Sequence, residues 1–416
     1  MKSSEFNENQ ILDEVKILDE VEAVAEKIKE DHIELTDGSV GWTVPGIYNN
    51  DLVISSNYGF YKGSMGVAVF FAACQKALET GDYFEWFERT VEPFLDPSPE
   101  FLQNERVVYD TGIGSFVLGF TLAAELLGEE RYLDLARRYM ESIDESKIEA
   151  CELYDYVGGL AGTVNVLLKY DEISGSDTGE EKARRCGDRL ISESEPVNDN
   201  QIKWVSEGRN SALTGFAHGN TGISYSLAKL WDETGEDRYR EYAVRALNWE
   251  MAQYNENRKN WPDYRSGEES YMDDWCHGSL GILWGQLYIQ DILGGDGIRY
   301  IIDNPLSEYS SVIGDSSVIG DSLVIGDNDC ICHGNFSKVE FFLDASDFLE
   351  EPKYSELAID MLEGMVERKQ RQGKWSLVGN FGSTFYDPSL YLGTAGVGYS
   401  LLRFLYGEEY PSVLMI

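Results

Sequence analysis

Three of the four histidines in the chain stand directly before a glycine, and two of these three also follow a cysteine. The motifs are Ala217-His218-Gly219, Cys276-His277-Gly278 and Cys332-His333-Gly334. Imidazole and thiolate are the ligands that zinc prefers in proteins. Because one local pattern recurs, it brings both kinds of side chain to equivalent places. The motifs therefore indicate a zinc site with an acid–base histidine beside it.

The histidine motifs belong to a repeat that extends along most of the chain. A Gly-x-x-Gly or Gly-x-x-Ser step, followed at once by an apolar segment, occurs seven times, with first glycines 47 to 60 residues apart. This spacing leaves room for two helices and two connections in each repeat. The steps are Gly63–Gly66, Gly112–Ser115, Gly159–Gly162, Gly219–Gly222, Gly278–Gly281, Gly334–Ser337 and Gly393–Gly396.

Two kinds of helix alternate in this repeat. The segment after a step is apolar on nearly all sides, as in residues 67–72, which predicts a helix buried all round. The intervening segments, such as residues 131–138 and 238–245, are rich in charge and typical of helices with one wet face. We therefore predict an all-α fold, an α/α toroid of seven inner and seven outer helices. Its glycine steps should gather at one end, where small residues let backbones approach closely.

Cys276, Cys332 and His333 are the candidate metal ligands. They stand in consecutive repeats at equivalent positions, so they can converge from adjacent helix starts. Two thiolates and one imidazole give zinc three protein ligands and leave a fourth position open, as catalytic sites do. The cysteines could instead be buried packing residues. Cys330 could bind the metal in place of Cys332, although it lies outside the register of the repeat.

His218 and Asp155 are the candidate acid–base residues. His218 has no neighbouring cysteine and lies one repeat before Cys276, so it can face the same opening unbound. A free imidazole transfers protons near neutral pH. Asp155 precedes the step of the repeat before that and could act as a base or orient His218, with Asp110, similarly placed, as the natural comparison. His218 could also be a core residue, and His277 could be a rival ligand or a supporting hydrogen-bond donor.

The composition restricts the partners. With 34 Lys+Arg against 74 Asp+Glu, the net charge of −40 repels nucleic acid and anionic membranes. The charge is typical of a surface kept soluble at high salt, and it would also attract cationic segments. No long apolar stretch occurs and residues 1–14 are polar, so we expect neither signal peptide nor membrane span. Six cysteines are too few for a disulfide scaffold, which favours a cytoplasmic protein with reduced thiols.

Two segments depart from the repeat. Residues 1–35 contain a charged helical stretch, Ile11 to Ile33, which we interpret as an N-terminal helical extension before the first repeat. Residues 310–327 hold three tandem hexapeptides of the form Ser-x-Val-Ile-Gly-Asp. Three copies are too few to bury the core of a β-helix, so we predict a surface-loop insertion there.

At these motifs the chain resembles the lanthipeptide cyclase family, and most of all the C-terminal cyclase domain of class II lanthipeptide synthetases. The likeness covers roughly residues 20–416, and it assigns residues 36–416 to a cyclase domain. The segments that carry it, besides the seven steps, are Gly215–Gly219, Trp261–Arg265, Trp275–Gly278, Cys332–Gly334 and Pro411–Leu414.

The resemblance implies zinc held by Cys276, Cys332 and His333, with His218 and Asp155 at the acid–base positions. The implied reaction is the addition of a peptide cysteine thiol to dehydroalanine or dehydrobutyrine, which closes a thioether ring. The implied substrate is a dehydrated precursor peptide, leader plus core. The class II enzymes carry a dehydratase domain before the cyclase; this sequence has none, so a separate dehydratase is expected.

Two other functions remain open at this point. Animal proteins that resemble the family add glutathione to dehydroamino acids, although anionic glutathione suits a protein of this charge only if the pocket is locally basic. The toroid could also be a scaffold that binds a peptide or a dehydratase, with a structural zinc whose fourth position is filled.

Overall fold

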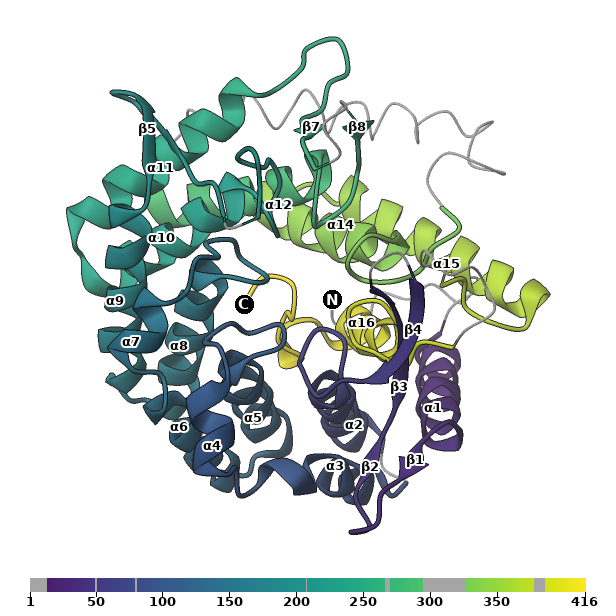
Figure 1. Cartoon of the computed structure of the whole chain (residues 1–416). Coiled ribbons are helices and arrows are strands. Elements are labelled where there is room, and N and C mark those ends of the chain that lie inside the picture. The colour runs from purple at the N-terminus through teal and green to yellow at the C-terminus, as the bar shows by residue number, and fades with distance from the viewer. Residues whose placement is uncertain are drawn as a thin grey trace.

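The computed structural model describes residues 13–48, 51–78, 81–206, 208–265, 270–294, 326–377 and 386–416. Helices dominate these residues and form a ring of inner helices enclosed by outer ones (Figure 1). The predicted all-α toroid is thus confirmed. None of the helices in the described ranges combines the length and the hydropathy needed to cross a membrane.

Seven inner helices begin at the seven glycine steps. The first glycine of each step is the N-cap, and most residues of the following helix are buried. The prediction of apolar inner helices is therefore confirmed. The inner helices are α2 (Ser64–Ala77), α5 (Ile113–Leu127), α8 (Leu160–Ser174), α10 (Asn220–Thr234), α12 (Ser279–Leu293), α14 (Asn335–Leu349) and α16 (Thr394–Tyr406).

The glycines of the steps allow each loop to fold back on its own helix. A Cβ atom at Gly162 would overlap the carbonyl oxygen of Tyr156, so the first turn of α8 packs directly on the loop before it. Gly278 has φ +93°, a conformation that L side chains rarely adopt, and a Cβ atom there would overlap the carbonyl of Met272. Glycine at these positions holds the loops that carry the candidate residues against the ends of the inner helices.

Outer helices flank the inner ring and are amphipathic. In α6 the buried residues Tyr132, Ala136, Tyr139 and Met140 form one face, as the helical period requires. The outer helices in the described part of the chain are α1 (Glu14–Glu30), α3 (Tyr83–Val91), α6 (Arg131–Glu141), α9 (Thr178–Ser192), α11 (Asp237–Ala252) and α15 (Lys353–Gln372). The place expected for a seventh outer helix, after α12, lies outside the described residues, as does the predicted insertion up to residue 325.

Helix α1 packs against α16, so the first helix of the chain is the outer partner of the last inner helix. Its residues Ile17, Val21 and Ile28 are fully buried in the common core. Residues 1–35 were predicted to be an extension before the first repeat, and this role for them was not predicted. The packing shows that α1 closes the ring.

Short elements connect the helices. In the described part of the chain, four antiparallel hairpins, which were not predicted from the sequence, and several short helical turns lie in these connections. The hairpins pair β1 (Ile33–Glu34) with β2 (Val40–Gly41), β3 (Thr43–Tyr48) with β4 (Asp51–Ser56), β5 (Glu195–Asn198) with β6 (Gln201–Lys203), and β7 (Pro262–Asp263) with β8 (Ser270–Tyr271). The short helices are α4 (Pro99–Asn104), α7 (Glu145–Glu149), η1 (Glu92–Phe94) and η3 (Gly407–Glu409).

The segment after η3 enters the centre of the ring (Figure 1). Val413 and Leu414 are fully buried there. The hydroxyl oxygen of Tyr156 accepts a 2.9 Å hydrogen bond from the backbone N–H of Ile416. The tail 411–416 therefore fills the space beneath the loops that precede the inner helices.

Candidate metal centre and acid–base pair

Cys276, Cys332 and His333 lie together. Their ligand atoms are all within 4.8 Å of one another, and both cysteines are buried. The loop before α12 supplies one candidate ligand and the loop before α14 supplies two. A tetrahedral zinc ion keeps sulfur and nitrogen ligands about 3.5–3.8 Å apart, so this donor set fits zinc with small adjustments of the side chains.

The pKa shifts of Cys276 and His333 are also typical of a site that can bind a metal. The hydrogen bond from Cys332, and after it that from His333, outweighs burial and holds the pKa of Cys276 well below its usual range. Burial lowers the pKa of His333, but hydrogen bonds to Cys276 and Cys330 outweigh it and raise that pKa to about 11. The contacts that lower the pKa of Cys276 favour negative charge on its sulfur, and a metal cation bound there would take the place of the protons.

Cys330 lies next to the group without belonging to it. Its Sγ accepts hydrogen bonds of 3.4 Å from the backbone N–H of His333 and from Nδ2 of Asn328. The alternative of Cys330 as a ligand in place of Cys332 therefore receives no support from the geometry. Cys330 instead shapes the loop from which Cys332 and His333 project.

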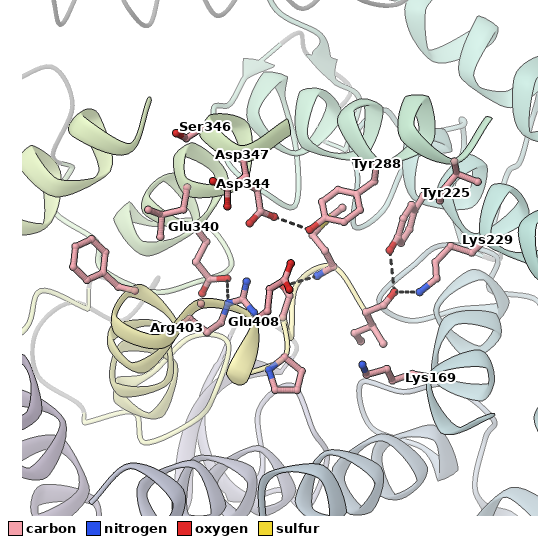
Figure 2. A pocket seen from close by; sticks show the side chains of 18 of the residues that line it. Lys169, Tyr225, Lys229, Tyr288, Glu340, Asp344, Ser346, Asp347, Arg403 and Glu408 are labelled. Carbon is pink, nitrogen blue, oxygen red and sulfur yellow. Dashed lines mark hydrogen bonds and ion pairs between the residues drawn. The ribbon is translucent and has the colours of Figure 1, made fainter. Parts of the chain in front are cut away.

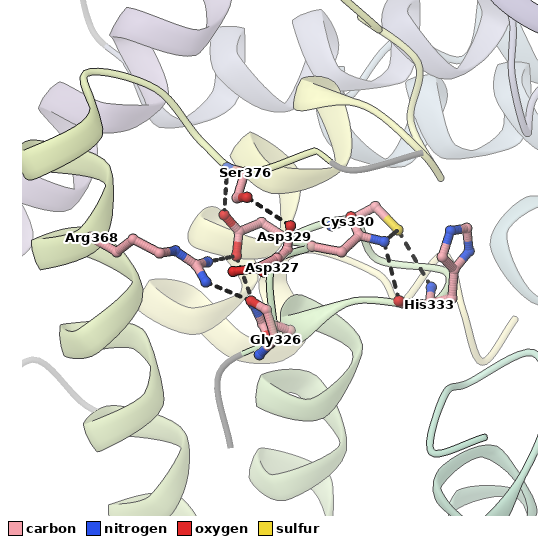
Figure 3. A network of polar contacts seen from close by, with 9 residues as sticks. Gly326, Asp327, Asp329, Cys330, His333, Arg368 and Ser376 are labelled. Atoms are coloured by element: carbon pink, nitrogen blue, oxygen red, sulfur yellow. Dashed lines mark hydrogen bonds and ion pairs between the residues drawn. The ribbon is translucent and has the colours of Figure 1, made fainter. Parts of the chain in front are cut away.

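A buried carboxylate anchors this loop (Figure 3). Asp329 forms an ion pair with Arg368 of α15, and its side chain is 1% exposed. Asp329 also accepts 2.8 Å hydrogen bonds from the backbone N–H of Ser376 and from Nδ2 of Asn335. Asp329 stands only three residues before Cys332, but no pattern in the sequence singled it out. Its contacts connect the ligand loop with an outer helix.

His218 and Asp155 form a hydrogen-bonded pair. Nδ1 of His218 lies 3.0 Å from Oδ2 of Asp155, and the other oxygen of Asp155 accepts a 2.7 Å hydrogen bond from the N–H of Gly158. The loop of His218 and the loop of Asp155 are also connected through Ala217. Its carbonyl accepts hydrogen bonds of 3.1 Å from the backbone N–H groups of Tyr156 and Val157. The side chain of His218 remains 26% exposed, so a substrate can reach it.

The environment shifts the pKa values of His218 and His277 in opposite directions. Burial lowers the pKa of His218, but the charge of Asp155 and its hydrogen bond outweigh burial, so the pKa is raised. Burial lowers the pKa of His277 to about 4. Its ring stacks on His218 with centroids 5.1 Å apart, and Nδ1 lies 3.3 Å from the carbonyl of Thr214. His277 is thus a neutral neighbour of His218 and stands outside the group of three ligands.

Asp110 provides the comparison for Asp155. Burial raises the pKa of Asp110 to about 6, and its side chain accepts a 3.1 Å hydrogen bond from Thr111. It makes no described hydrogen bond with His218. Position before a glycine step is therefore not sufficient, and only Asp155 is paired with the imidazole.

Glu250 anchors the loop that carries His218. This side chain of α11 is fully buried, and its two oxygens accept the backbone N–H groups of Gly215 at 3.0 Å and Thr221 at 3.1 Å. Those N–H groups lie around the N-terminus of α10, where a carboxylate is favoured. Sequence reasoning missed Glu250, because one glutamate in an outer helix does not stand out among 74 acidic residues.

Tyr61 is a further residue at the site that sequence reasoning missed. Its hydroxyl donates a 2.9 Å hydrogen bond to Sγ of Cys332. Tyr61 stands two positions before the first glycine of its step, as Cys276 and Cys332 do in theirs. That shared register is the signal that could have identified it.

A separate cavity lies away from this site. A cavity of about 930 Å³ has Tyr225, Lys229 and Arg403 in its lining (Figure 2). Glu125 and Glu172, in the last turns of α5 and α8, also line it, whereas the five candidate residues precede the first turns of inner helices. None of the five lines this cavity, so it belongs to the opposite end of the ring.

Comparisons with known proteins agree with this architecture. A family model described as "Lanthionine synthetase C-like protein" matches residues 55–415. The "Lacticin 481/lactococcin biosynthesis protein LcnDR2" of Lactococcus lactis subsp. lactis is 21% identical over 414 residues, which cover 92% of this chain and 40% of that protein. The chain thus spans well under half of that relative's length. The solved structure of nisin cyclase aligns with a TM-score of 0.66 at 18% identity, over 95% of each chain, and shows the same fold.

Proposed function

The chain belongs to the lanthionine synthetase C-like family, and on that premise we propose that it is a zinc-dependent cyclase of dehydrated peptides. The reaction adds a peptide cysteine thiol to dehydroalanine or dehydrobutyrine and forms a thioether ring. One observation carries the proposal. The three zinc-type ligands and the His218–Asp155 pair lie on loops at the same end of the ring, before consecutive inner helices.

Cys276, Cys332 and His333 would hold the metal. When bound, zinc supplies a fourth position for a substrate thiol and lowers the pKa of that thiol, so that thiolate is present near neutrality. The two cysteines are buried and come from different repeats, so the ring itself sets their separation. All six cysteines are free thiols, so Cys276 and Cys332 are available to bind a metal.

His218 moves the proton that the reaction requires. The sulfur attacks the β-carbon, the carbon–carbon double bond breaks, and the electron pair passes to the carbonyl to form an enolate. The α-carbon then takes a proton. The thiol proton passes to solvent and the imidazolium of His218 donates to the α-carbon, so the protons balance once solvent reprotonates His218. The exposed part of His218 and its raised pKa suit this role as proton donor.

Asp155 orients His218 and stabilises its charged form. Its Oδ2 accepts a hydrogen bond from Nδ1–H of His218. The opposite ring nitrogen, Nε2, is left for the substrate. Gly158 fixes the other carboxylate oxygen. The neutral ring of His277 packs beside the imidazole and adds no competing charge.

The proposed partners are a dehydrated precursor peptide, leader plus core, and a separate dehydratase that makes its dehydro residues. The net charge of −40 favours peptides with basic segments. Zinc is the proposed cofactor, and the reduced thiols are consistent with a cytoplasmic setting.

The test is a cyclisation assay with a dehydrated peptide that contains an internal cysteine. Ring closure leaves the mass unchanged, so the remaining thiols are counted by alkylation and mass spectrometry. We expect the zinc-loaded protein to remove alkylatable thiols, and the chelator-treated protein to leave them. Thiols that persist with the zinc-loaded protein would overturn the proposal. Preferential addition of free glutathione to a cysteine-free dehydro peptide would assign a thiol-transfer function instead.

A further inference from the structure

We propose that Tyr61 is a positioning residue of the metal centre, which acts through Cys332. Its hydroxyl donates a hydrogen bond of 2.9 Å to the Cys332 sulfur. The inference rests on the proposed function, because it takes Cys332 as a metal ligand. It concerns how that ligand is held and how reactive its sulfur is.

Backbone hydrogen bonds fix Tyr61 relative to Cys332. The N–H of Cys332 donates to the carbonyl of Tyr391 at 3.2 Å, and the N–H of Tyr391 donates to the carbonyl of Tyr61 at 3.1 Å. With the bond from the Tyr61 hydroxyl to Sγ, these contacts form a closed cycle of three residues. The cycle joins the first, sixth and seventh repeats, so no single residue can shift without breaking a bond.

Stacking on a second aromatic ring also holds the ring of Tyr61 in place. It stacks on Tyr391 with centroids 4.4 Å apart and planes inclined by 22°. Tyr391 is fully buried, and its own hydroxyl donates to the carbonyl of Val413 in the tail. The tail 411–416 thereby helps to hold both rings in place next to the loop that carries Cys332.

The hydrogen bond has a chemical consequence at Cys332. A donor that bonds to a thiolate draws charge from the sulfur and makes that sulfur a weaker nucleophile. When a substrate thiolate joins Cys276 and Cys332, the electrophilic dehydro residue has several sulfurs to react with. The hydrogen bond from the Tyr61 hydroxyl makes the Cys332 sulfur less reactive than it would be without that bond. It thus favours attack by the substrate sulfur and protects the ligand from alkylation.

Tyr399 offers a matched control. It is fully buried like Tyr391, and its hydroxyl donates a 2.9 Å hydrogen bond to the carbonyl of Pro411 in the same tail. It makes no described hydrogen bond or ring contact with Tyr61 or Cys332. Tyr399→Phe therefore removes a buried phenol hydroxyl and a tail contact without changing the environment of Cys332.

The experiment compares wild type, Tyr61→Phe and Tyr399→Phe as cobalt- and zinc-loaded proteins. In Tyr61→Phe we expect a shifted thiolate-to-cobalt charge-transfer band and about tenfold weaker zinc binding in competition with a chelator. Iodoacetamide should alkylate Cys332 several-fold faster, as measured by peptide mapping. Tyr399→Phe should match wild type in all three measurements.

An unchanged band, zinc affinity and alkylation rate in Tyr61→Phe would overturn the inference and leave the proposed function intact. A wild-type protein that binds neither cobalt nor zinc would overturn both. If Tyr61→Phe does not fold, Tyr391→Phe keeps the stacked ring but releases it from Val413. It should shift the band in the same direction by a smaller amount, and no shift in that variant would count against the inference.

Discussion

Nδ1 of His218 lies 3.0 Å from Oδ2 of Asp155, although the two residues are 63 positions apart in the chain. They precede neighbouring inner helices, and the carbonyl of Ala217 joins their loops a second time. The pair is therefore built into the contact between two repeats. The contact between those repeats keeps the carboxylate of Asp155 beside the imidazole of His218.

Replacement of His218 by alanine should abolish most of the activity and spare the metal. We expect cyclisation to fall about 10²- to 10⁴-fold, the range for loss of a general acid–base group. Zinc content should stay near one per chain, because His218 is not among the three ligands. His32→Ala is the control, since the ring of His32 packs against Trp86 and makes no described contact with His218. An unchanged cyclisation rate in His218→Ala would refute its assignment.

Replacement of Asp155 by asparagine should move the pH profile. Asp155 raises the pKa of His218, so the imidazolium and the stability it contributes are present at low pH and lost as pH rises through that pKa. Without the carboxylate charge the pKa falls, and the alkaline limb of the rate profile should move to lower pH. Asp110→Asn should leave the limb in place, because Asp110 bonds Thr111 and not His218. A limb at the wild-type position in Asp155→Asn would contradict this account.

The repeat is what singled out the candidate ligands from sequence. Cys276 and Cys332 share one register before their glycine steps, and those steps start buried helices that all reach the same end of the ring. The same register contains Tyr61, which was missed because a phenol is not a typical zinc ligand and the chain has 25 tyrosines. Residue type and register together predict the ligands, while neutral donors to those ligands carry no comparable signal.

Contacts between inner loops and outer helices could not be predicted. Glu250 anchors the loop of His218 and Asp329 anchors the loop of Cys332 and His333, but each acts on backbone N–H groups that no sequence pattern identifies. Helix α1 was missed as the partner of α16 for a related reason. A ring places the two ends of its repeat side by side, and the sequence separation of these helices conceals that contact.

Serine substitutions at the two cysteines of the ligand loop should distinguish their roles. Cys332→Ser should lower zinc binding well below one per chain, because its sulfur belongs to the group of three. Cys330→Ser should retain zinc, since Cys330 only accepts hydrogen bonds from His333 and Asn328. Metal analysis by mass spectrometry after dialysis measures both. Loss of zinc in Cys330→Ser with full retention in Cys332→Ser would exchange the two assignments.

The buried ion pair between Asp329 and Arg368 should be needed for both stability and metal binding. Asp329→Asn leaves the Arg368 guanidinium, 11% exposed, without its charged partner. Such a loss costs about 3–5 kcal/mol of unfolding free energy, which urea titration measures. Because the same carboxylate holds the loop of Cys332 and His333, zinc affinity should also fall, by about tenfold.

Glu340 and Arg403 form the control for this last prediction. Their side chains are 2% and 11% exposed, nearly the same as in the first pair, but they line the cavity at the opposite end of the ring (Figure 2). Glu340→Gln should therefore cost similar stability and leave zinc affinity unchanged. If both variants weakened zinc binding equally, the effect would follow from global destabilisation. A loss confined to Asp329→Asn would show that this ion pair acts through the ligand loop.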